Sequence, residues 1–457
     1  MPGSTVRTLL LLALAGFYLA GATEHAKRVN NFKARGDQSG YLGDAEAVYA
    51  NWHGRTPPLL IGERNRMPLY AGYLALFYSP SMSDDEYFVV AKRANIYLSL
   101  GLLALLAAIL ARFLKPVPAA NLLLVVAFGY FVFKAGYAQS ELLFYFLFFV
   151  AFLLMLKTLT AHGGASPTLE TAAGAGAFAA LAHLTKAALL PLMAIFVVSC
   201  ALSGIAKKRS PAPFSDGSVE KGAGLLFFLA AAVATAVFLA VLSPYLLTNK
   251  RVFGHYFYNV NTTFYMWYDD WPRASVGTIL HGDGVGWPTM PADQLPSASR
   301  YWREHTAGQI AARVAAGFAD MAERSYKTYW YLNYVVAFLA FALLLVATRW
   351  KDVSALIRAR PAAAAFLVMY ALAYLFGIAF YAPVSGTGTT RFLLAHLLPL
   401  LFVLSLLFTR EPFCSSEWKV GRIALRTRHF QLLISAMLAF DLLFVIWPRL
   451  MTTYGGF

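Results

Sequence analysis

Residues 223–246 read AGLLFFLAAAVATAVFLAVLSPYL, a run without a single charged side chain. A helix of about 20 predominantly apolar residues is long enough to cross the hydrocarbon core of a bilayer, which is about 30 Å thick. This run therefore predicts a transmembrane helix, and it indicates the kind of fold to expect from the chain around it.

The rest of the 457-residue chain has the same character, since 59% of its residues are hydrophobic and only 13% are charged. Its mean hydropathy is +0.57. Soluble globular domains are closer to half apolar and a quarter charged. The chain has too little polar surface to cover several soluble domains, and its composition excludes a disordered, collagenous or disulfide-stapled protein. We predict an all-α polytopic membrane protein that forms one integral membrane domain over residues 1–457.

Working outward from residues 223–246, we find about eleven candidate spans by length and hydropathy. The first follows a single basic residue, Arg7, and resembles a signal peptide. No clear cleavage site leads from it into a soluble domain, so we interpret it as an uncleaved span. The candidates cover roughly residues 7–26, 94–112, 117–134, 139–158, 168–185, 187–206, 223–246, 328–348, 362–382, 392–409 and 429–448.

The net charge of +15, from 38 Lys and Arg against 23 Asp and Glu, has a simple explanation in such a chain. In a soluble protein it would suggest nucleic acid. Here most short loops rich in Lys and Arg fall on one side of the membrane when the N-terminus is placed in the cytoplasm. We therefore predict a cytoplasmic N-terminus, an outside C-terminus, a plasma (inner) membrane location and no nucleic-acid partner. These loops contain Arg112, Lys115, Lys157, Lys207, Lys208, Arg209, Lys221, Arg349, Lys351, Arg358, Arg360, Arg410, Lys419, Arg422, Arg426 and Arg428.

Two long segments, 27–93 and 249–327, then lie together on the non-cytoplasmic face. Loops of this length are usually functional or form small domains of their own. In the first, residues 83–93 indicate a capped helix, which either runs along the membrane surface or extends the second span. The two cysteines, Cys200 and Cys414, fit neither a metal-binding spacing nor a disulfide framework.

The first long loop contains two carboxylates and two cations with candidate roles. Asp44 and Glu46 are two residues apart, so on a helix they point in different directions. One is a candidate general base and the other an orienting group, but this stretch taken alone favours the alternative, in which Asp44 is a helix N-cap after Gly43 and Glu46 interacts with the helix dipole. Arg64 and Arg66 are candidates to bind a phosphate, or they belong to an ordinary salt-bridged loop. Pro68, just after them, suits the start of a helix.

Ionisable groups at membrane edges are costly and therefore suggest function. Glu141 is either a substrate-facing carboxylate or a residue stabilised by the dipole at the start of a span. Lys186, three residues after His183, either binds a lipid phosphate or extends to the interface. Arg391 opens the tenth span from the outside and leaves the same two alternatives.

The second long loop places aromatic rings beside carboxylates at Tyr268, Asp269 and Asp270. Rings stack on the apolar faces of sugars and carboxylates accept their hydroxyl hydrogen bonds, but an interfacial aromatic belt has the same composition. The chain has neither a Walker A pattern nor HExxH, and we predict no certain cofactor. A divalent cation held by Asp44 and an aspartate of the second loop remains an alternative.

Taken in order along the chain, four motifs resemble those of the GT-C glycosyltransferase superfamily. The likeness is to the branch with the protein O-mannosyltransferases and the lipid A aminoarabinose transferases. The chain departs from that branch where Ala45 separates two acids that are often adjacent. The motifs are Asp44-Ala45-Glu46-Ala47-Val48-Tyr49, Met67-Pro68-Leu69-Tyr70, Leu184-Thr185-Lys186 with Leu189-Leu190-Pro191, and Arg391-Phe392-Leu393-Leu394 with Leu397-Leu398-Pro399.

The resemblance implies an inverting transfer of a sugar from a polyprenyl-phosphate donor to a hydroxyl group of a glycan, lipid or protein acceptor, outside the cytoplasm. Such a donor also makes membrane lipid a partner. In this reading Asp44 or Glu46 is catalytic, and the donor phosphate is bound by Lys186, Arg391, Arg64 and Arg66. The substrate-binding candidates are Glu141, Tyr70, His183, Tyr268, Asp269 and Asp270.

Two other functions remain as alternatives. A transporter or flippase of lipid-linked glycans predicts ionisable residues deep in the spans, where the sequence has few. A polymerase or ligase of surface glycans predicts more reliance on Arg and His of the late loop. The transferase predicts that Asp44, Lys186 and Arg391 meet at one outward-facing cavity.

Overall fold

The computed structural model describes residues 2–29, 37–54, 66–160, 168–209, 217–327, 331–386, 389–420 and 423–452. In the described part of the first half of the chain, every regular element is a helix. Its elements are α1 (Pro2–Val29), α2 (Gln38–Trp52), α3 (Pro68–Ala75), α4 (Asp84–Phe113), α5 (Pro116–Val126), the π-helical turn η1 (Ala127–Phe131), α6 (Val132–Lys134), α7 (Glu141–Leu159), α8 (Leu169–Thr185), α9 (Leu190–Arg209) and α10 (Gly217–Phe253).

The second half adds short helices, more long helices and one small hairpin. Its elements are α11 (Val260–Thr263), η2 (Tyr265–Trp267), α12 (Trp271–Val276), η3 (Thr278–His281), α13 (Ala298–Glu304), α14 (Ala307–Lys327), α15 (Leu332–Thr348), α16 (Trp350–Ala359), α17 (Pro361–Ser385), α18 (Thr389–Thr409), β1 (Glu417–Val420), β2 (Ile423–Arg426), α19 (Thr427–Asp441), the π-helical turn η5 (Leu442–Ile446) and α20 (Trp447–Leu450). Strands β1 and β2 pair antiparallel, with Glu417 opposite Arg426.

Seven helical segments of the described chain are long and apolar enough to cross a membrane, and the protein is membrane-embedded. They are α4, α5 to α6, α7, the part of α10 from Gly224, α17, α18, and α19 to α20. The pair α14 and α15 adds an eighth if it is one broken span. The predicted all-helical membrane fold is therefore confirmed. The other predicted spans fall on α1, α8 and α9, and the count of eleven and the orientation stay predictions.

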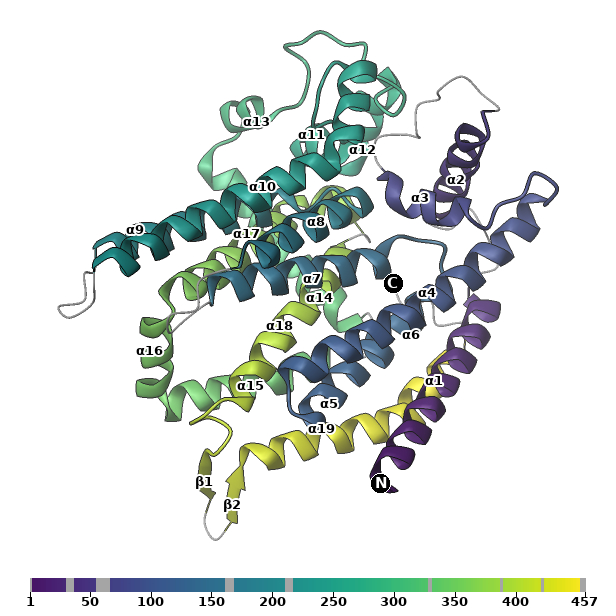
Figure 1. Ribbon diagram of the computed structural model, residues 1–457. Helices are drawn as coiled ribbons and strands as arrows, with labels where there is room; N and C mark the ends of the chain where they lie inside the picture. The colour runs from purple at the N-terminus through teal and green to yellow at the C-terminus, as the bar shows by residue number, and fades with distance from the viewer. Residues whose placement is uncertain are drawn as a thin grey trace.

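Helix α7 lies at the centre of the bundle and is buried along most of its length. Helices α8, α9, α17 and α18 contact it, as Figure 1 shows. Helix α8 also packs closely on α10, because a Cβ at Gly176 would overlap the carbonyl oxygen of Ala234. The bundle thus rests on a dense apolar core, in which bulky side chains from α7 meet small ones from α8.

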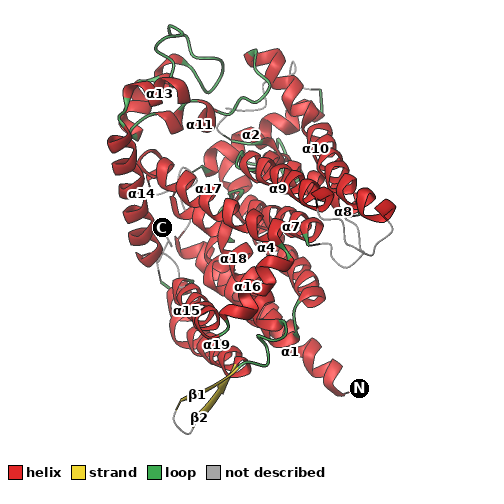
Figure 2. Cartoon of the chain, turned by 90° about the vertical axis from the view of Figure 1, so that its left-hand side faces the viewer, coloured by secondary structure: helices red, strands yellow, loops and turns green. Residues whose placement is uncertain are grey.

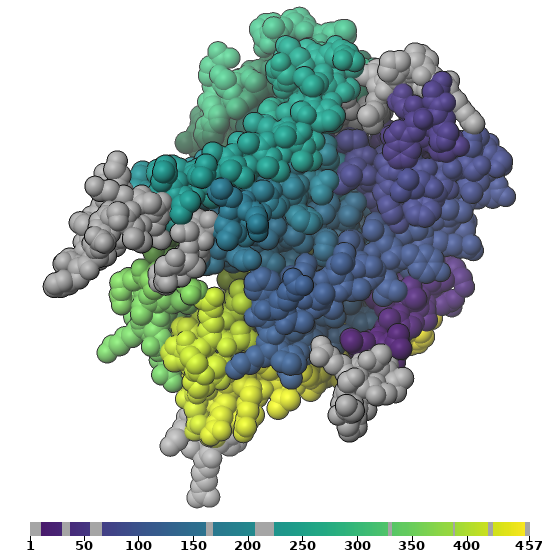
Figure 3. All heavy atoms as spheres, in the orientation of Figure 1, coloured from purple at the N-terminus to yellow at the C-terminus, as the bar shows by residue number. Residues whose placement is uncertain are grey.

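The two long loops form compact helical structures at the same end of the bundle, which we name the cavity end (Figures 1 and 2). In the first loop, Tyr41 of α2, Tyr70 of α3 and Tyr87 of α4 are all buried in one cluster. The second loop, with α11 to α13, has its own cluster around Tyr258 and Phe264. Figure 3 shows both loops side by side on the outer surface of that end.

Helix α4 settles the two alternatives for residues 83–93. Ser83 caps the helix, since its side chain accepts a hydrogen bond from the Glu86 N–H while the Glu86 carboxylate accepts one from the Ser83 N–H. The helix then continues without a break from Asp84 to Phe113. The segment extends the second predicted span.

Candidate functional site

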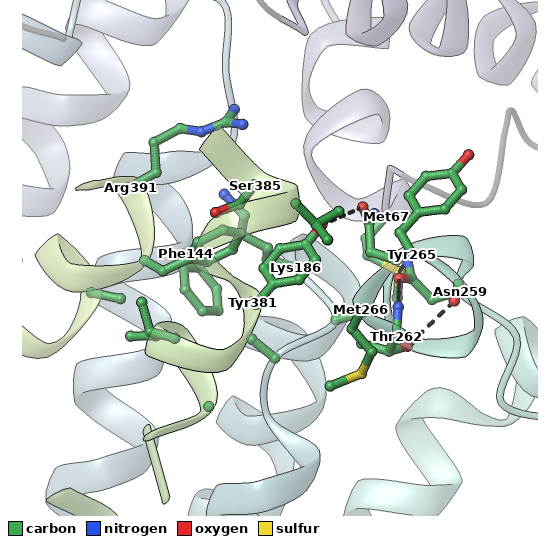
Figure 4. A pocket seen from close by; sticks show the side chains of 18 of the residues that line it. Met67, Phe144, Lys186, Asn259, Thr262, Tyr265, Met266, Tyr381, Ser385 and Arg391 are labelled. Atoms are coloured by element: carbon green, nitrogen blue, oxygen red, sulfur yellow. Dashed lines mark hydrogen bonds between the residues drawn. The ribbon is translucent and has the colours of Figure 1, made fainter. Parts of the chain in front are cut away.

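A cavity of about 790 Å³ lies at the cavity end, between the two long loops and the helices α9, α17 and α18. One wall is apolar and comes from the spans. Polar groups line the rest of the cavity: Lys186, Arg391, Tyr381 and Ser385, at the ends of α8, α17 and α18, face Asn259 and Tyr265 of the second long loop across the space (Figure 4). The apolar wall includes Leu190, Pro191, Ala373, Gly377, Ile378 and Ala395.

Glu141 is buried beneath the charged side of the cavity and binds both cations there. It is the first residue of α7, where a carboxylate is favoured by the helix dipole, and its side chain is only 3% exposed. Its Oε1 accepts hydrogen bonds from Lys186 Nζ and from Arg391 Nη1, each at 3.3 Å. The sequence named these three residues separately, and the structure brings them together.

Each of the two cations is fixed by the end of a helix. Lys186 follows the last residue of α8 in an extended conformation, and its ammonium lies 5.0 Å from the centre of the Phe392 ring. Arg391 lies in the first turn of α18. Burial lowers the pKa of Lys186, and the neighbouring Glu141 carboxylate opposes this shift.

Asp37 is the carboxylate among the described residues that line the cavity, and it was not predicted from the sequence. Its Oδ2 accepts a hydrogen bond from Arg391 Nη1 at 2.6 Å, and its side chain is 43% exposed. It directly precedes α2, which the buried Gln38 ties to the bundle by accepting a hydrogen bond from the Ala138 N–H. An acid just before a helix was the only local signal available.

Tyr41 and Lys134 complete the surroundings of this charged cluster. Tyr41 lines the cavity, its hydroxyl is 2.7 Å from Ser140 Oγ, and burial raises its pKa. Lys134 is buried at the end of α6, near enough to Glu141 and Arg391 for electrostatic interaction. Lys134 was not among the residues predicted from the sequence, although a cation inside an apolar run is the same signal that pointed to Lys186.

Asp44 lies outside the cavity lining. It sits inside α2, whose start at Gln38 shows that the N-cap alternative for Asp44 is wrong. Its Oδ2 accepts a hydrogen bond from Arg66 Nε at 3.0 Å, and Arg66 does line the cavity. The guanidinium of Arg66 lies directly over Gly40, where a Cβ would overlap it. Asp44 therefore acts on the cavity through Arg66.

Three further candidates of the first half, Glu46, Tyr70 and His183, are not among the residues that line the cavity. Glu46 lies near Tyr87, on a different face of α2 from Asp44. Tyr70 is buried and donates a hydrogen bond to Asn95 Oδ1 at 3.0 Å. His183 is buried on α8, with its ring 6.0 Å from that of Phe238. Arg64 lies outside the described residues.

The second-loop candidates hold the loop together. The Tyr268 hydroxyl accepts a hydrogen bond from the Thr278 N–H at 2.9 Å. Asp270 caps α12 through the Arg273 N–H. Asp269 is 3.0 Å from His305 Nε2. The loop residues that do line the cavity are Asn259, Asn261, Thr262, Tyr265, Met266 and Trp271.

Arg313 of α14 connects this loop to the bundle. Its side chain donates hydrogen bonds to the carbonyl oxygens of Phe380 on α17 and Met266 of the loop, at 2.8 and 3.2 Å. Its guanidinium also stacks 4.0 Å from the centre of the Phe380 ring and lies 3.8 Å from Asp269. Since Met266 lines the cavity, Arg313 fixes the position of one cavity wall.

The predicted alternative of a divalent cation stays open. In the part of the chain that the structure describes, no three His, Cys, Asp or Glu side chains come together as metal ligands. Asp44, the first residue considered for this role, forms an ion pair with Arg66, and among the second-loop aspartates Asp269 lies beside His305.

Fold and site together define a polytopic helical membrane protein with a cavity that joins a carboxylate and three cations to an apolar wall. Comparison of the chain with models of protein families, with curated proteins and with solved structures gives no match.

Proposed function

We propose that this protein is an inverting glycosyltransferase that moves a sugar from a polyprenyl-phosphate donor to an acceptor hydroxyl on the non-cytoplasmic face of the membrane. The proposal rests on the resemblance of the four sequence motifs to the GT-C superfamily and on the cavity. A plasma or inner membrane location belongs to the same proposal.

The observation that carries the proposal is one cavity with two chemically distinct parts. Lys186 and Arg391 present two cations, and Asp37 presents a carboxylate beside them. The wall that continues from them is built of apolar residues of α9, α17 and α18. A prenyl phosphate has the matching composition, since it joins an anionic head to a long hydrocarbon chain.

In the proposed reaction Asp37 accepts the proton of the acceptor hydroxyl. The acceptor oxygen attacks the anomeric carbon from the side opposite the phosphate, which inverts the configuration. The bond between that carbon and the phosphate oxygen breaks, and its electron pair leaves on the phosphate. Lys186 and Arg391 stabilise the negative charge that grows there, which is the kind of interaction that lowers a transfer barrier most.

Asp37 and the donor phosphate compete for the same guanidinium. In the structure Arg391 Nη1 binds both Asp37 and Glu141. A phosphate that takes over Arg391 leaves the Asp37 carboxylate facing the acceptor. Glu141 stays behind the cations as a positioning residue, and Arg66 supplies a third cation to the cavity lining.

The test compares Asp37→Asn with Asp44→Asn in the purified protein, with a labelled polyprenyl-phospho-sugar as donor and membrane lipid or glycan extracts as acceptors. Loss of a general base typically costs a factor of about 100 to 10,000, so Asp37→Asn should reduce turnover by that order. Asp44→Asn should have a smaller effect because it reaches the cavity only through Arg66. Wild-type turnover in Asp37→Asn at normal protein levels would exclude Asp37 as the base.

The same donor separates transfer from transport. In proteoliposomes, a transferase cleaves the bond between sugar and phosphate and releases polyprenyl phosphate. A flippase moves the intact donor between leaflets. Movement of intact donor without cleavage, in the presence of every acceptor fraction, would overturn the proposed activity.

A further inference from the structure

A second group of cations lies at the end of the bundle opposite the cavity. Helix α16 joins α15 to α17, and α17 lines the cavity only in its second half, from Ala373 to Ser385. Since a helix rises about 1.5 Å per residue, the start of α17, which α16 directly precedes, lies about 18 Å along the helix from the nearest of these residues. Figures 1 and 2 both show α16 far from α11 and α13.

Helix α16 is amphipathic, and none of its residues is buried. Val353 and Leu356 pack against the core of the bundle. Trp350 and Ile357 lie on the neighbouring face of the helix, and they remain 60% and 46% exposed. Since α17 begins at Pro361 and is a membrane span, α16 is held at the membrane boundary, where exposed apolar side chains contact lipid.

The basic residues of α16 are placed next to these apolar side chains. Lys351 and Arg358 are seven residues apart, so they share a face, and both are exposed beside Trp350 and Ile357. Arg358 donates a hydrogen bond to Ser354, and neither cation forms an ion pair with any described residue. The only acid of the helix, Asp352, lies 3.9 Å from Arg349.

Further cations adjoin α16 from neighbouring helix ends. Arg360 caps the start of α17, and Arg410 follows the end of α18. Burial lowers the pKa of Arg410, and the positive charge of Arg360 lowers it further. Neither cation is ion-paired to a described carboxylate, and both lie at helix ends on this side of the bundle, so they add to the positive charge beside α16 that attracts an anion.

We infer that α16 and the adjoining arginines form a binding site for anionic phospholipid headgroups, in the leaflet that faces this end of the bundle. Trp350 and Ile357 enter the acyl boundary, while Lys351, Arg358 and Arg360 contact the phosphates. The site is separate from the cavity and does not depend on the proposed transferase activity.

The test is lipid binding by the full-length protein in an uncharged detergent, titrated with phosphatidylglycerol or, as a neutral comparison, phosphatidylcholine. Native mass spectrometry counts the lipids retained. The variant Lys351→Gln/Arg358→Gln/Arg360→Gln removes three charges. Each basic residue at an anionic membrane surface contributes a factor of about five in affinity, so phosphatidylglycerol affinity should fall by a factor on the order of 100.

A matched variant removes three exposed charges at the cavity end instead, as Lys250→Gln/Arg251→Gln/Arg303→Gln. It should retain phosphatidylglycerol as the wild type does. An equal loss in both variants would show a net-charge effect only, and wild-type binding by the α16 variant would overturn the inference.

A conservative variant guards against a folding defect. Arg358→Lys/Arg360→Lys keeps both charges, so it should bind phosphatidylglycerol nearly as the wild type does. Attraction to an anionic surface depends more on the charge than on the planar geometry of the guanidinium group. Binding of the wild type should also weaken with added salt, since exposed charges are screened. Equal retention of both lipids by the wild type at low salt would contradict the site.

Discussion

Neutralising Glu141 is the sharpest test of how the cavity is built. The change Glu141→Gln preserves the shape of a side chain that is 3% exposed and removes its charge. Its Oε1 lies 3.3 Å from both Lys186 Nζ and Arg391 Nη1. After the change Arg391 keeps Asp37, whereas Lys186 has no other ion pair among the described residues.

The magnitude follows from these distances. At 3.3 Å, two unit charges attract by about 5 kcal/mol with an effective dielectric constant of about 20. Much of this attraction offsets the loss of hydration in the wild type, but breaking a buried pair leaves an uncompensated charge and typically costs about 3–5 kcal/mol. We therefore expect Glu141→Gln to lower the melting temperature by several degrees.

Polyprenyl phosphate should restore much of this loss, because its phosphate supplies the missing negative charge. A ligand at about 100 times its Kd stabilises a protein by about 2.7 kcal/mol. The assay is thermal unfolding in detergent, followed by intrinsic fluorescence with and without polyprenyl phosphate. Glu170→Gln, at an exposed acid in the first turn of α8, is the matched control.

Two results would refute the reasoning. One is a melting temperature of Glu141→Gln equal to that of the wild type, which would mean that the cations do not need the carboxylate. The other is a ligand-induced shift no larger than in the wild type, which would place phosphate binding away from Lys186 and Arg391.

Three further predictions concern the same cavity. Burial lowers the pKa of Lys186, so this side chain loses its charge at a lower pH than an ordinary lysine does. The affinity for polyprenyl phosphate should therefore fall as the pH rises from about 7 to about 10, and in Lys186→Arg the affinity should stay constant. A titration with a fluorescent analogue of polyprenyl phosphate measures both. Gly40→Ala should displace the Arg66 guanidinium and raise the KM of transfer roughly tenfold. Gly43→Ala is the control, because a Cβ there meets open space, and it should leave the KM unchanged. Equal KM values for the two variants would exclude a role of Arg66 in substrate binding. Arg313→Lys should lower turnover several-fold with little change in melting temperature. Lysine lacks the planar guanidinium that binds two carbonyl groups and stacks on the Phe380 ring. Unchanged turnover would show that the cavity wall at Met266 does not need Arg313.

The fold was largely predictable because its main signal is local. A long apolar run must become a helix in a membrane, since no water is available there for the backbone polar groups. Helix α14 was harder to predict from the sequence, because it is amphipathic and falls within the second long loop. Its place against α17 depends on Gly317, where a Cβ would overlap the carbonyl oxygen of Ala379, and such a contact has no local signature.

The site was predictable only in part, and the limit lies at the start of α2. Lys186, Arg391 and Glu141 were found because charges at span ends stand out in an apolar sequence. Asp37 was missed in favour of Asp44, seven residues later. The helix starts at Gln38, whose buried side chain binds the Ala138 N–H, so a contact distant in sequence sets which acid faces the cavity.

The charge excess of +15 therefore serves different purposes at the two ends of the molecule. At the cavity end, Lys186, Arg391 and Arg66 each have a carboxylate within 3.3 Å, so they are held in fixed positions before any substrate binds. Fixed cations suit a transition state, because they need no reorganisation when charge develops. At the opposite end, Lys351 and Arg358 form no ion pair with a described residue and adjoin exposed apolar side chains. Exposed cations of this kind suit a lipid surface, where many headgroup arrangements must be accommodated. Removing a carboxylate at the cavity end should consequently alter catalysis, whereas removing a cation from α16 should alter lipid binding and leave transfer chemistry unchanged.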